Sequence, residues 1–496
     1  MNPWQKPVKV TTFSFKGDLY PFQHQGALFL AGVKNCLFTD SVGLGKTVQA
    51  IVAIDILRNK TSDLQVIVVT MASVQIQFER EIHKFLPAIK AKAVLGDQKT
   101  RTRIYEDFAN KKIDIIILNY SQPVRDTAKT LVDGIVYDGP LTNGVKNSKY
   151  IMILDEVQKC KNVSSKTSKS ILGLKQRSLG VKAMTATPVY THLIDLYGIF
   201  KLIDPNIFKT KEQFKKEFCK VQFPPFCPYG RIVGYKNHDI LKERIKNFVF
   251  GRTKSEVAKD LPPLVTKDVF VTLPKEHRKV YDKLDQQIDL LDENLKKEKI
   301  ASMVQMQVCV NALESTKDYS GGLVSHPKLD EVARLVEEDL VDEKVVIYSR
   351  YLDTLALLTK KIKDFSDIFR ITGVESQLQR DKNLSLWRES KRTACMLITD
   401  AGGAGLNLQI ASTLILIDRP WSGGQLDQLR GRIHRIGSAH KSLLEINVVA
   451  ENTIDEYVLK SLRDKRTNST LVFGDTDSPI PLDAILEMRS AQKTKR

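Results

Sequence analysis

At 496 residues the chain is too long for one ordinary hydrophobic core, and two or three domains of about 150 to 200 residues are expected. Hydrophobic residues make up 42% of the sequence and charged residues 27%, a balance that excludes a largely disordered chain. The net charge of +18, from 76 Lys and Arg against 58 Asp and Glu, favours a polyanionic partner. Nucleic acid is the first such partner and an anionic membrane the second; a merely basic soluble protein is the plain alternative.

The apolar runs of the sequence are of strand length, so we expect no membrane-spanning helix. The amino end has neither the apolar segment nor the cleavage site of a signal peptide, which predicts an intracellular protein, cytoplasmic or with DNA in a nucleoid or nucleus. Cys219, Cys227 and His238 offer three zinc ligands where a structural site needs four. Free thiols in a reducing compartment are therefore the preferred interpretation.

Short β-rich runs alternate with amphipathic helical stretches through the first 200 residues. The expected strands are 35–39, 64–70, 113–119, 150–155 and 180–185. This alternation predicts a parallel α/β sheet. A proline-rich break at 223–230 (FPPFCPYG) follows, and after it a polar helical region that is richest in 275–313. Four residues at helical spacing in this region are interpreted as packing residues: Leu284, Ile288, Leu291 and Leu295.

The α/β pattern resumes in the second half. Its expected strands are 343–349, 367–372, 394–400, 412–418 and 442–450. The sequence thus predicts two α/β lobes joined by a helical segment. The expected division is a first lobe at 1–222, a linker and helical insertion at 223–330, a second lobe at 331–470 and a basic tail at 471–496.

A candidate phosphate loop, DSVGLGKTVQA, follows the first expected strand and opens a helix. Gly43 and Gly45 would let backbone N–H groups approach phosphate oxygens at a helix N-terminus. Lys46 would lie against the β- and γ-phosphates of ATP, and the Thr47 hydroxyl would hold Mg²⁺. The strict pattern fails at its first glycine, where Asp40 stands, so a glycine-rich turn with an incidental Lys-Thr is the alternative.

Two adjacent acids end the strand in IMILDEVQ, at the rim where α/β sheets bind ligands. Asp155 is predicted to coordinate Mg²⁺ and Glu156 to polarise the attacking water. Strand caps are the alternative for both residues. The order of strand, Gly-Lys-Thr, helix, strand and Asp-Glu favours a nucleotide site.

A cluster of arginines lies near the end of the chain, in QLDQLRGRIHRIGSAH. Asp427 cannot neutralise Arg430, Arg432 and Arg435 together, so the partner is expected to be an anion bound elsewhere in the sequence. Phosphoryl transfer spreads charge over oxygens that a desolvated guanidinium stabilises bidentately. A surface turn that contacts nucleic acid is the alternative, to which Arg430 in particular is assigned.

An ordered series of motifs resembles helicase superfamily two, and more specifically the SWI/SNF-type ATPases, over roughly Leu19 to Leu459. In the first half these motifs are LYPFQHQGALFL, DSVGLGKTVQAI, VIVVTMASVQIQFEREIHKF, IIILNY, DEVQKCKN, MTATPVYTHLIDLYGIFKLIDP and GRTKSEVAKDLPP. In the second half KVVIYSRY, ITG followed by Arg380, LITDAGGAGLNLQIASTLILIDRPWS and QLRGRIHRIGSAH occur in the same order. Each motif is moderately specific, and their order makes the set very specific.

The resemblance implies an α/β fold of two RecA-like parallel-sheet lobes, with a linker and helical insertions, that hold ATP and Mg²⁺. It implies that Gln23 reads adenine, that Leu44 belongs to the phosphate loop, and that Arg432 and Arg435 reach the γ-phosphate from the second lobe while Gln428 helps to hold the closed state. Supplying arginines from the other lobe would make hydrolysis conditional on closure.

Three positions depart from the family pattern: Gln158 stands where histidine is common, Ala186 where glycine is often found, and Gly251 where a second arginine is usual. None of these removes a phosphate, metal or water-orienting group. Because glutamine cannot become cationic, the coupling between the lobes is expected to differ.

The resemblance also implies that both lobes grip one strand of nucleic acid through its backbone. The expected contacts are Ser73, Asn119, Ser349, Arg350, Thr399, Gly402 and Gly403. Hydroxyls, amides and backbone N–H groups of this kind contact phosphate and sugar, not base sequence. Helix-cap or turn roles are the alternative for each of them.

The sequence therefore predicts a DNA-dependent ATPase that translocates on DNA, mainly double-stranded, as a monomeric motor, and that remodels DNA or protein–DNA complexes in repair, recombination or transcription. Single-stranded DNA is a possible second substrate, and partner proteins are not identified. A strand-separating, fork-remodelling or annealing helicase, an RNA-dependent ATPase and a non-hydrolysing DNA-binding module are the alternatives.

Overall fold

The computed structural model describes residues 8–9, 14–132, 135–188, 193–222, 231–258, 261–290, 296–316, 319, 321, 325–400, 406–421 and 423–464. The chain divides into two compact units near Asp260 and Leu261. The sequence analysis placed a separate linker and insertion at 223–330, whereas here the part of that range after Asp260 belongs to the second unit. The expected basic tail at 471–496 lies outside the described residues.

The first unit is built on a parallel sheet with the strand order β13-β3-β10-β9-β4-β6-β5. Its strands are β3 (Asn35–Phe38), β4 (Gln65–Thr70), β5 (Ala91–Ala93), β6 (Ile115–Asn119), β9 (Tyr150–Asp155), β10 (Val181–Met184) and β13 (Val249–Phe250). Five of them match expected strands. β5 and β13 were not expected, because two or three residues are too few to show a periodic pattern.

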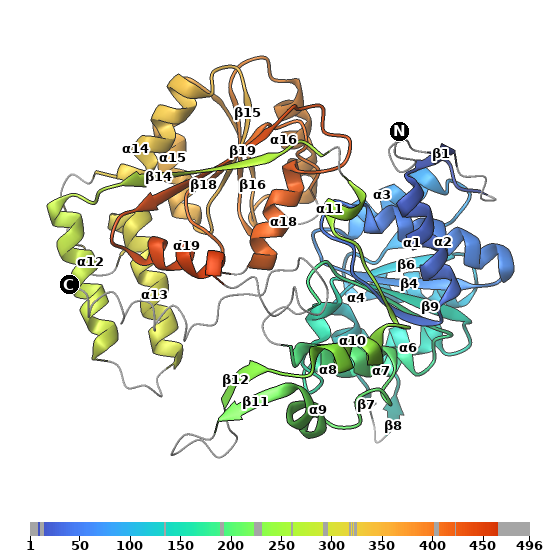
Figure 1. Cartoon of the computed structure of the whole chain (residues 1–496). Coiled ribbons are helices and arrows are strands. Elements are labelled where there is room, and N and C mark those ends of the chain that lie inside the picture. Colours follow the sequence, from blue (N-terminus) through green and yellow to red (C-terminus); the bar gives the residue numbers. More distant parts are fainter. Residues whose placement is uncertain are drawn as a thin grey trace. The chain divides into compact units, whose positions relative to one another are not determined.

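Helices cover both faces of this sheet (Figure 1). The helices of the first unit are α1 (Pro21–Gly32), α2 (Lys46–Lys60), α3 (Gln75–Phe85), α4 (Gln98–Ala109), α5 (Gln122–Asp126), α6 (Pro140–Val145), α7 (Lys166–Lys175), α8 (Asp195–Ile203), α9 (Lys211–Phe218), α10 (His238–Ile245) and α11 (Lys254–Val257). One core contains side chains of α1, α2 and α3, and the other contains side chains of α4, α6, α7, α8, α9 and α10. Burial on both faces explains why β4 and β9 read as nearly continuous apolar runs.

Three antiparallel two-stranded sheets complete the first unit. They pair β1 (Val8–Lys9) with β2 (Asp18–Leu19), β7 (Thr130–Val132) with β8 (Ile135–Tyr137), and β11 (Cys219–Gln222) with β12 (Arg231–Tyr235). The 3-10 turn Val157–Cys160 follows β9 directly, and it carries the chain away from the Asp-Glu pair.

The second unit is built on a parallel sheet with the order β14-β19-β18-β15-β17-β16. Its strands are β14 (Leu264–Val271), β15 (Lys344–Tyr348), β16 (Asp367–Ile371), β17 (Ala394–Ile398), β18 (Thr413–Leu416) and β19 (Leu443–Ala450). All except β14 were expected. β14 is a mostly exposed edge strand that pairs with β19 along its full length, so residues assigned to a linker form part of this sheet.

The helices of the second unit are α12 (Lys275–Asp289), α13 (Lys296–Asn311), α14 (Pro327–Arg334), α15 (Leu352–Ile362), α16 (Gln377–Glu389), α18 (Gly423–Ile433) and α19 (Ile454–Asp464). A short turn at Leu313–Ser315 and a π-helical turn at Leu335–Asp339 follow α13 and α14. α12, α13 and α19 share one core (Figure 1). Leu284 and Ile288 are buried in it, as expected for packing residues, while Leu291 and Leu295 lie outside the described residues.

Five cysteines, Cys36, Cys160, Cys219, Cys309 and Cys395, are buried free thiols, and Cys227 lies outside the described residues. No group of three or more His, Cys, Asp or Glu side chains is placed to hold a metal ion in the described ranges. Among those same residues, no helix has the length and apolar character needed to cross a membrane.

Candidate nucleotide-binding site

The candidate phosphate loop connects β3 to α2, which begins at Lys46. Gly43 and Gly45 have φ values of +88° and +79°, in the left-handed region that favours glycine. A Cβ atom placed on Gly45 would lie 2.5 Å from the side-chain nitrogen of Gln23, so a larger residue would displace Gln23 from the loop as well as strain the backbone. The loop therefore presents backbone N–H groups at the start of a 15-residue helix.

Lys46 and Thr47 open α2 and are both half-buried. The Lys46 ammonium donates to the backbone carbonyls of Asp40, at 2.9 Å, and Ser41, at 3.4 Å. A bound phosphate would compete with these carbonyls for the same ammonium.

Gln23, the predicted adenine-reading residue, lies on α1 and contacts the phosphate loop. Its side-chain nitrogen donates to the Leu44 carbonyl at 3.1 Å, and its side-chain oxygen accepts from the Tyr20 N–H at 3.1 Å. The structure thus brings Gln23, Leu44 and Gly45 together.

Asp155 and Glu156 stand at the carboxyl end of β9, between β10 and β4 in the sheet. The Thr70 hydroxyl, at the end of β4, donates to the Asp155 carboxylate at 2.8 Å. Burial first, and then repulsion by Glu156, raise the pKa of Asp155 to about 7, while the Thr70 hydrogen bond and the Lys46 charge act to lower it. Lys46, Asp155 and Glu156 therefore share one electrostatic neighbourhood.

Glu156 has a left-handed backbone, with φ of 56° and ψ of 51°. A residue other than glycine in this region costs about 1 kcal/mol or more, and such strain concentrates at functional sites. The side-chain nitrogen of Gln158 donates to the Glu156 carboxylate at 2.6 Å. The glutamine that replaces the family's histidine is thus bonded directly to the predicted water-orienting residue.

The oxygen donors at this site suit Mg²⁺, which typically takes one or two protein oxygens and completes its shell with phosphate and water. Asp155 and Thr47 would supply a carboxylate and a hydroxyl. Burial and the neighbouring Glu156 carboxylate raise the pKa of Asp155. A divalent cation bound there would stabilise the ionised form of both carboxylates.

The sequence analysis missed the partners of Asp40. This aspartate is fully buried, and the Arg252 guanidinium donates to both of its oxygens, at 3.0 Å and 2.6 Å, while Gln49 donates to one of them at 3.0 Å. Both the departure at Asp40 and the motif that contains Arg252 are visible in the sequence, but nothing in the sequence pairs residues 212 positions apart.

In the second unit, Gln428 and Arg432 lie one turn apart on α18, and Arg435 follows the end of that helix. All three side chains are half-buried, and Arg435 donates to the Leu406 carbonyl at 3.3 Å. Arg430 differs, because it donates to both oxygens of the fully buried Glu445 on β19, at 2.6 Å and 3.0 Å. The assignment of Arg430 to a surface turn on nucleic acid is corrected by this internal ion pair.

The predicted nucleic-acid contacts of the first unit lie near the carboxyl ends of β4, β5 and β6. Asn119 ends β6; its side-chain oxygen accepts from the Ser121 N–H, and its side-chain nitrogen donates to Gln75 at 3.0 Å. Ser73 is half-buried in the turn before α3. The Asn119 side chain thus makes the turn contacts that were its alternative, and its contact with nucleic acid stays a prediction.

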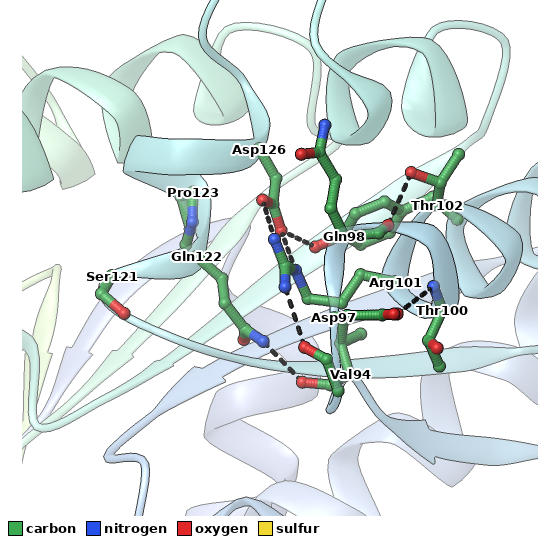
Figure 2. A network of polar contacts seen from close by, with 12 residues as sticks. Val94, Asp97, Gln98, Thr100, Arg101, Thr102, Ser121, Gln122, Pro123 and Asp126 are labelled. Atoms are coloured by element: carbon green, nitrogen blue, oxygen red, sulfur yellow. Dashed lines mark hydrogen bonds and ion pairs between the residues drawn. The ribbon is translucent and has the colours of Figure 1, made fainter.

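A polar network supports this edge of the sheet (Figure 2). The Arg101 guanidinium pairs with both oxygens of Asp126 at 2.9 Å, and the Gln122 side chain donates to the Val94 carbonyl at 2.5 Å. Because these side chains are buried, they fix the loop after β5 against α5.

Ser349 in the second unit is completely buried, and its hydroxyl donates to Asp418 at 2.6 Å. Its hydroxyl is therefore committed inside the unit and is not a contact for nucleic acid. Arg350 is partly exposed, with its guanidinium 5.6 Å from the Trp421 ring and an ion pair to Asp400 at 3.4 Å. Thr399 is buried, and Gly402 and Gly403 lie outside the described residues.

Helix α13 reaches the same region. The Gln307 side-chain oxygen accepts hydrogen bonds from the Tyr351 hydroxyl at 2.9 Å and from the Trp421 indole at 3.1 Å. Asn311, one turn later, donates to Asp418 at 3.0 Å. The helical region at 275–313 therefore contacts residues next to Arg350, which the sequence analysis could not foresee.

A phosphate loop and an Asp-Glu pair on one parallel sheet, followed by a second parallel sheet, define a nucleotide-binding protein with two RecA-like lobes. The SNF2-related domain model matches residues 22–318, and the helicase conserved C-terminal domain model matches residues 327–437. The chain belongs to the SNF2-related family.

Among similar proteins, an uncharacterized ATP-dependent helicase of Mycoplasma pneumoniae is 26% identical over 92% of this chain and 42% of its own length. The ISWI chromatin-remodeling complex ATPase ISW1 of Saccharomyces cerevisiae is 26% identical over 92% of this chain and 40% of its own length. The chain thus spans less than half the length of either relative. A Sulfolobus solfataricus SWI2/SNF2 ATPase core in complex with dsDNA is 21% identical, with 98% of each chain covered and a TM-score of 0.44.

Proposed function

We propose that this chain is a DNA-dependent ATPase that uses ATP hydrolysis to move along DNA, mainly double-stranded, and so remodels DNA or protein–DNA complexes in repair, recombination or transcription. The observation that carries the proposal is the shared neighbourhood of Lys46, Asp155 and Glu156 at strand ends, in a chain of the SNF2-related family. The names of the helicase and remodeling ATPase relatives support ATP as the substrate. The net charge of +18 supports a nucleic-acid partner.

In this proposal Lys46 leaves the carbonyls of Asp40 and Ser41 to bind the β- and γ-phosphates. Glu156 orients the attacking water, and the hydrogen bond from Gln158 holds its carboxylate in one direction. Thr47 and Asp155 would hold Mg²⁺, which neutralises charge on phosphate oxygens when bound. Gln23 would contact adenine while it remains bonded to the loop.

We further propose that Arg432 and Arg435 contact the γ-phosphate when the lobes close, and that Gln428 stabilises the closed state. Gln428 and Arg432 share one face of α18, whereas Arg430 faces Glu445 on the sheet, which leaves a distinct role for each arginine. Each cycle of closing and opening would then advance the chain along DNA held by Ser73, Asn119, Arg350, Gly402 and Gly403. Ser349 and Thr399 are not part of this set, because both are buried.

The test is ATP hydrolysis measured in parallel with duplex DNA, single-stranded DNA and RNA. We expect strong stimulation by DNA that weakens as salt rises, because phosphate contacts release counterions. Lys46→Ala and Arg435→Ala should each abolish stimulated hydrolysis. Stimulation by RNA alone would replace the DNA motor with an RNA-dependent ATPase, and no hydrolysis with any nucleic acid would leave a binding module.

A strand-separating helicase is the second candidate, because the Mycoplasma pneumoniae relative is named an ATP-dependent helicase. Displacement of a third strand from intact duplex reports translocation without unwinding, whereas release of one strand of a forked duplex reports unwinding. We expect the first activity to exceed the second.

A further inference from the structure

The carboxylate of Asp40 is buried in the phosphate loop at the position where the strict loop pattern has a glycine. Its relative exposure is 0%, and such a charge is strongly destabilising unless it is paired. Arg252 and Gln49 supply that pairing through three hydrogen bonds. The same residue's carbonyl is the acceptor for the Lys46 ammonium. The position of Asp40 therefore determines the position of the Lys46 ammonium.

Arg252 comes from the segment that leaves the first unit. This segment runs beside the loop, since Phe250 on β13 pairs with Phe38 on β3 and the Ser41 N–H donates to the Arg252 carbonyl at 3.0 Å. A Cβ atom placed on Gly251 would lie 1.9 Å from the Thr39 hydroxyl, so a second arginine does not fit at that position. The guanidinium also lies over the rings of Phe22 and Phe250, at 5.2 Å and 4.7 Å from their centroids, which fixes its plane.

Continuous contacts lead from Arg252 to both ends of the nucleotide site. Arg252 donates to the Gln49 side-chain oxygen at 3.0 Å, and Gln49 donates to the Leu44 carbonyl at 3.2 Å. Gln23 donates to that same carbonyl. Arg252 also donates to the Phe22 carbonyl, next to Gln23. One side chain thus links the predicted adenine-reading residue and the phosphate loop to the chain's exit from the first unit.

We propose that Arg252 is a positioning residue for nucleotide binding, acting through Asp40 and Gln49, and that the Asp40–Arg252 pair holds the loop in its phosphate-binding shape. The inference rests on the proposed function, because it assumes that the loop binds ATP. It adds that a residue just before the unit boundary controls the site, so motion of the exit segment would reach the loop directly.

A purely structural role for the pair makes a different prediction. If the pair only neutralises a buried charge, removing both charges leaves stability and nucleotide affinity at the parental level. If it positions the loop, removing both charges restores stability but not nucleotide affinity, because the loop loses its anchor.

Gly26 offers a perturbation that changes no charge. A Cβ atom placed on Gly26 would lie 1.9 Å from the Gln49 side-chain oxygen and 2.8 Å from an Arg252 nitrogen. Gly26→Ala should therefore disturb the Arg252–Gln49 contact, although alanine is normally the better helix residue. Gly32→Ala in the same helix is the matched control, since nothing lies within 4 Å of a Cβ atom placed there.

The experiment measures equilibrium binding of a fluorescent ADP analogue with Mg²⁺, together with thermal unfolding, for the full chain and its variants. We expect Gly26→Ala and the double variant Asp40→Asn, Arg252→Met to fold and to bind at least roughly tenfold more weakly, with Gly32→Ala unchanged. Arg252→Lys should keep only part of the parental affinity, because an ammonium lacks the planar fork with which the guanidinium bonds Asp40 and Gln49 at once.

Parental affinity in the folded double variant and in Gly26→Ala would overturn the inference and leave the proposed function intact. Absence of binding by the parent chain would overturn the proposed function instead. Arg58→Met, which breaks the Arg58–Asp114 pair near the far end of α2, should lower stability without changing affinity.

Discussion

The side-chain nitrogen of Gln158 lies 2.6 Å from the carboxylate of Glu156, two residues earlier in the chain. Glutamine keeps the same charge at every working pH, whereas histidine in its place would titrate near pH 6.5. The contact therefore orients the proposed water-positioning group without adding a pH-dependent charge beside it.

Replacing Gln158 should separate the effect of its hydrogen bond to Glu156 from the effect of a charge that changes with pH. Gln158→Leu removes the hydrogen bond, and we expect DNA-stimulated kcat to fall roughly tenfold or more. Gln158→His should keep more of the activity and add a pH dependence near neutrality. Hydrolysis rates between pH 5.5 and 8.5 report both effects, and identical pH profiles for the parent and the histidine variant would contradict this role.

The protonation state of Asp155 should affect the stability of the folded protein. Burial and Glu156 raise the pKa of Asp155 from 3.8 to about 7. Between about pH 4 and pH 7 the native state therefore keeps a proton that the unfolded chain has already lost. The free energy of unfolding falls as pH rises through that window. Asp155→Asn should raise the melting temperature of the nucleotide-free protein at pH 8, with the gain vanishing below pH 4.

The same substitution should abolish ATP hydrolysis, because an amide is a poor ligand for Mg²⁺ compared with a carboxylate. Calorimetry at pH 4 and pH 8 supplies the comparison, with Thr70→Val as a control that removes a hydrogen bond to the same carboxylate. A melting temperature at pH 8 equal to that of the parent would show that the Asp155 carboxylate carries no such penalty.

Most of the parallel strands could be predicted because they are rich in buried apolar residues, as in β4, β9 and β17. The short strands β5 and β13 and the edge strand β14 lack that signal. They are strands because each pairs with a neighbouring strand of the sheet. The second unit begins earlier in the chain than expected for the same reason. The sequence of β14 is typical of a linker, but the strand pairs with β19.

Within the candidate site, the order of motifs predicted Lys46, Thr47, Asp155 and Glu156, because each lies at or after the end of a strand that could be located. Side-chain partners distant in sequence could not be found in this way. Arg252 for Asp40, Glu445 for Arg430 and Asp418 for Ser349 all depend on the tertiary fold. The interpretation of Arg430 and Ser349 as surface groups failed because their acidic partners are buried strand-end or mid-strand residues.

Arg430 and Arg435 should respond differently to substitution, although they lie only five positions apart. Arg430→Met leaves Glu445 buried with the longer Arg419 contact of 3.4 Å, and we expect a loss of about 3 kcal/mol in the free energy of unfolding of the second unit. Arg435→Ala should leave stability nearly unchanged while stimulated hydrolysis falls by about 10³ or more.

Denaturant unfolding and ATPase assays on the same preparations distinguish the two effects. The double variant Arg430→Met, Glu445→Met is the control, since it removes Arg430 and Glu445 together while Arg419 keeps its hydrogen bond to Asn447 at 2.8 Å, and it should recover much of the stability. A catalytic loss for Arg430→Met that persists in this stable double variant would assign Arg430 to the reaction as well.

Helix α13 supports Arg350 through Trp421, so the helical region should affect DNA binding more than ATP chemistry. Gln307→Leu removes the acceptor shared by Tyr351 and Trp421, which frees the ring that lies beside the Arg350 guanidinium. We expect the DNA concentration for half-maximal stimulation to rise roughly threefold to tenfold, because the proposed phosphate contact of Arg350 loses its support. Hydrolysis without DNA should stay at the parental rate.

Gln305→Leu, the same change two residues earlier on the same helix, is the matched control, because Gln305 is half-exposed while Gln307 is fully buried. The salt dependence of stimulation distinguishes positioning of Arg350 from general loosening: loss of one phosphate contact lowers the slope of log affinity against log salt by about one. A rise in half-maximal DNA concentration with an unchanged salt slope would mean that α13 supports the fold of the second unit and not its grip on DNA.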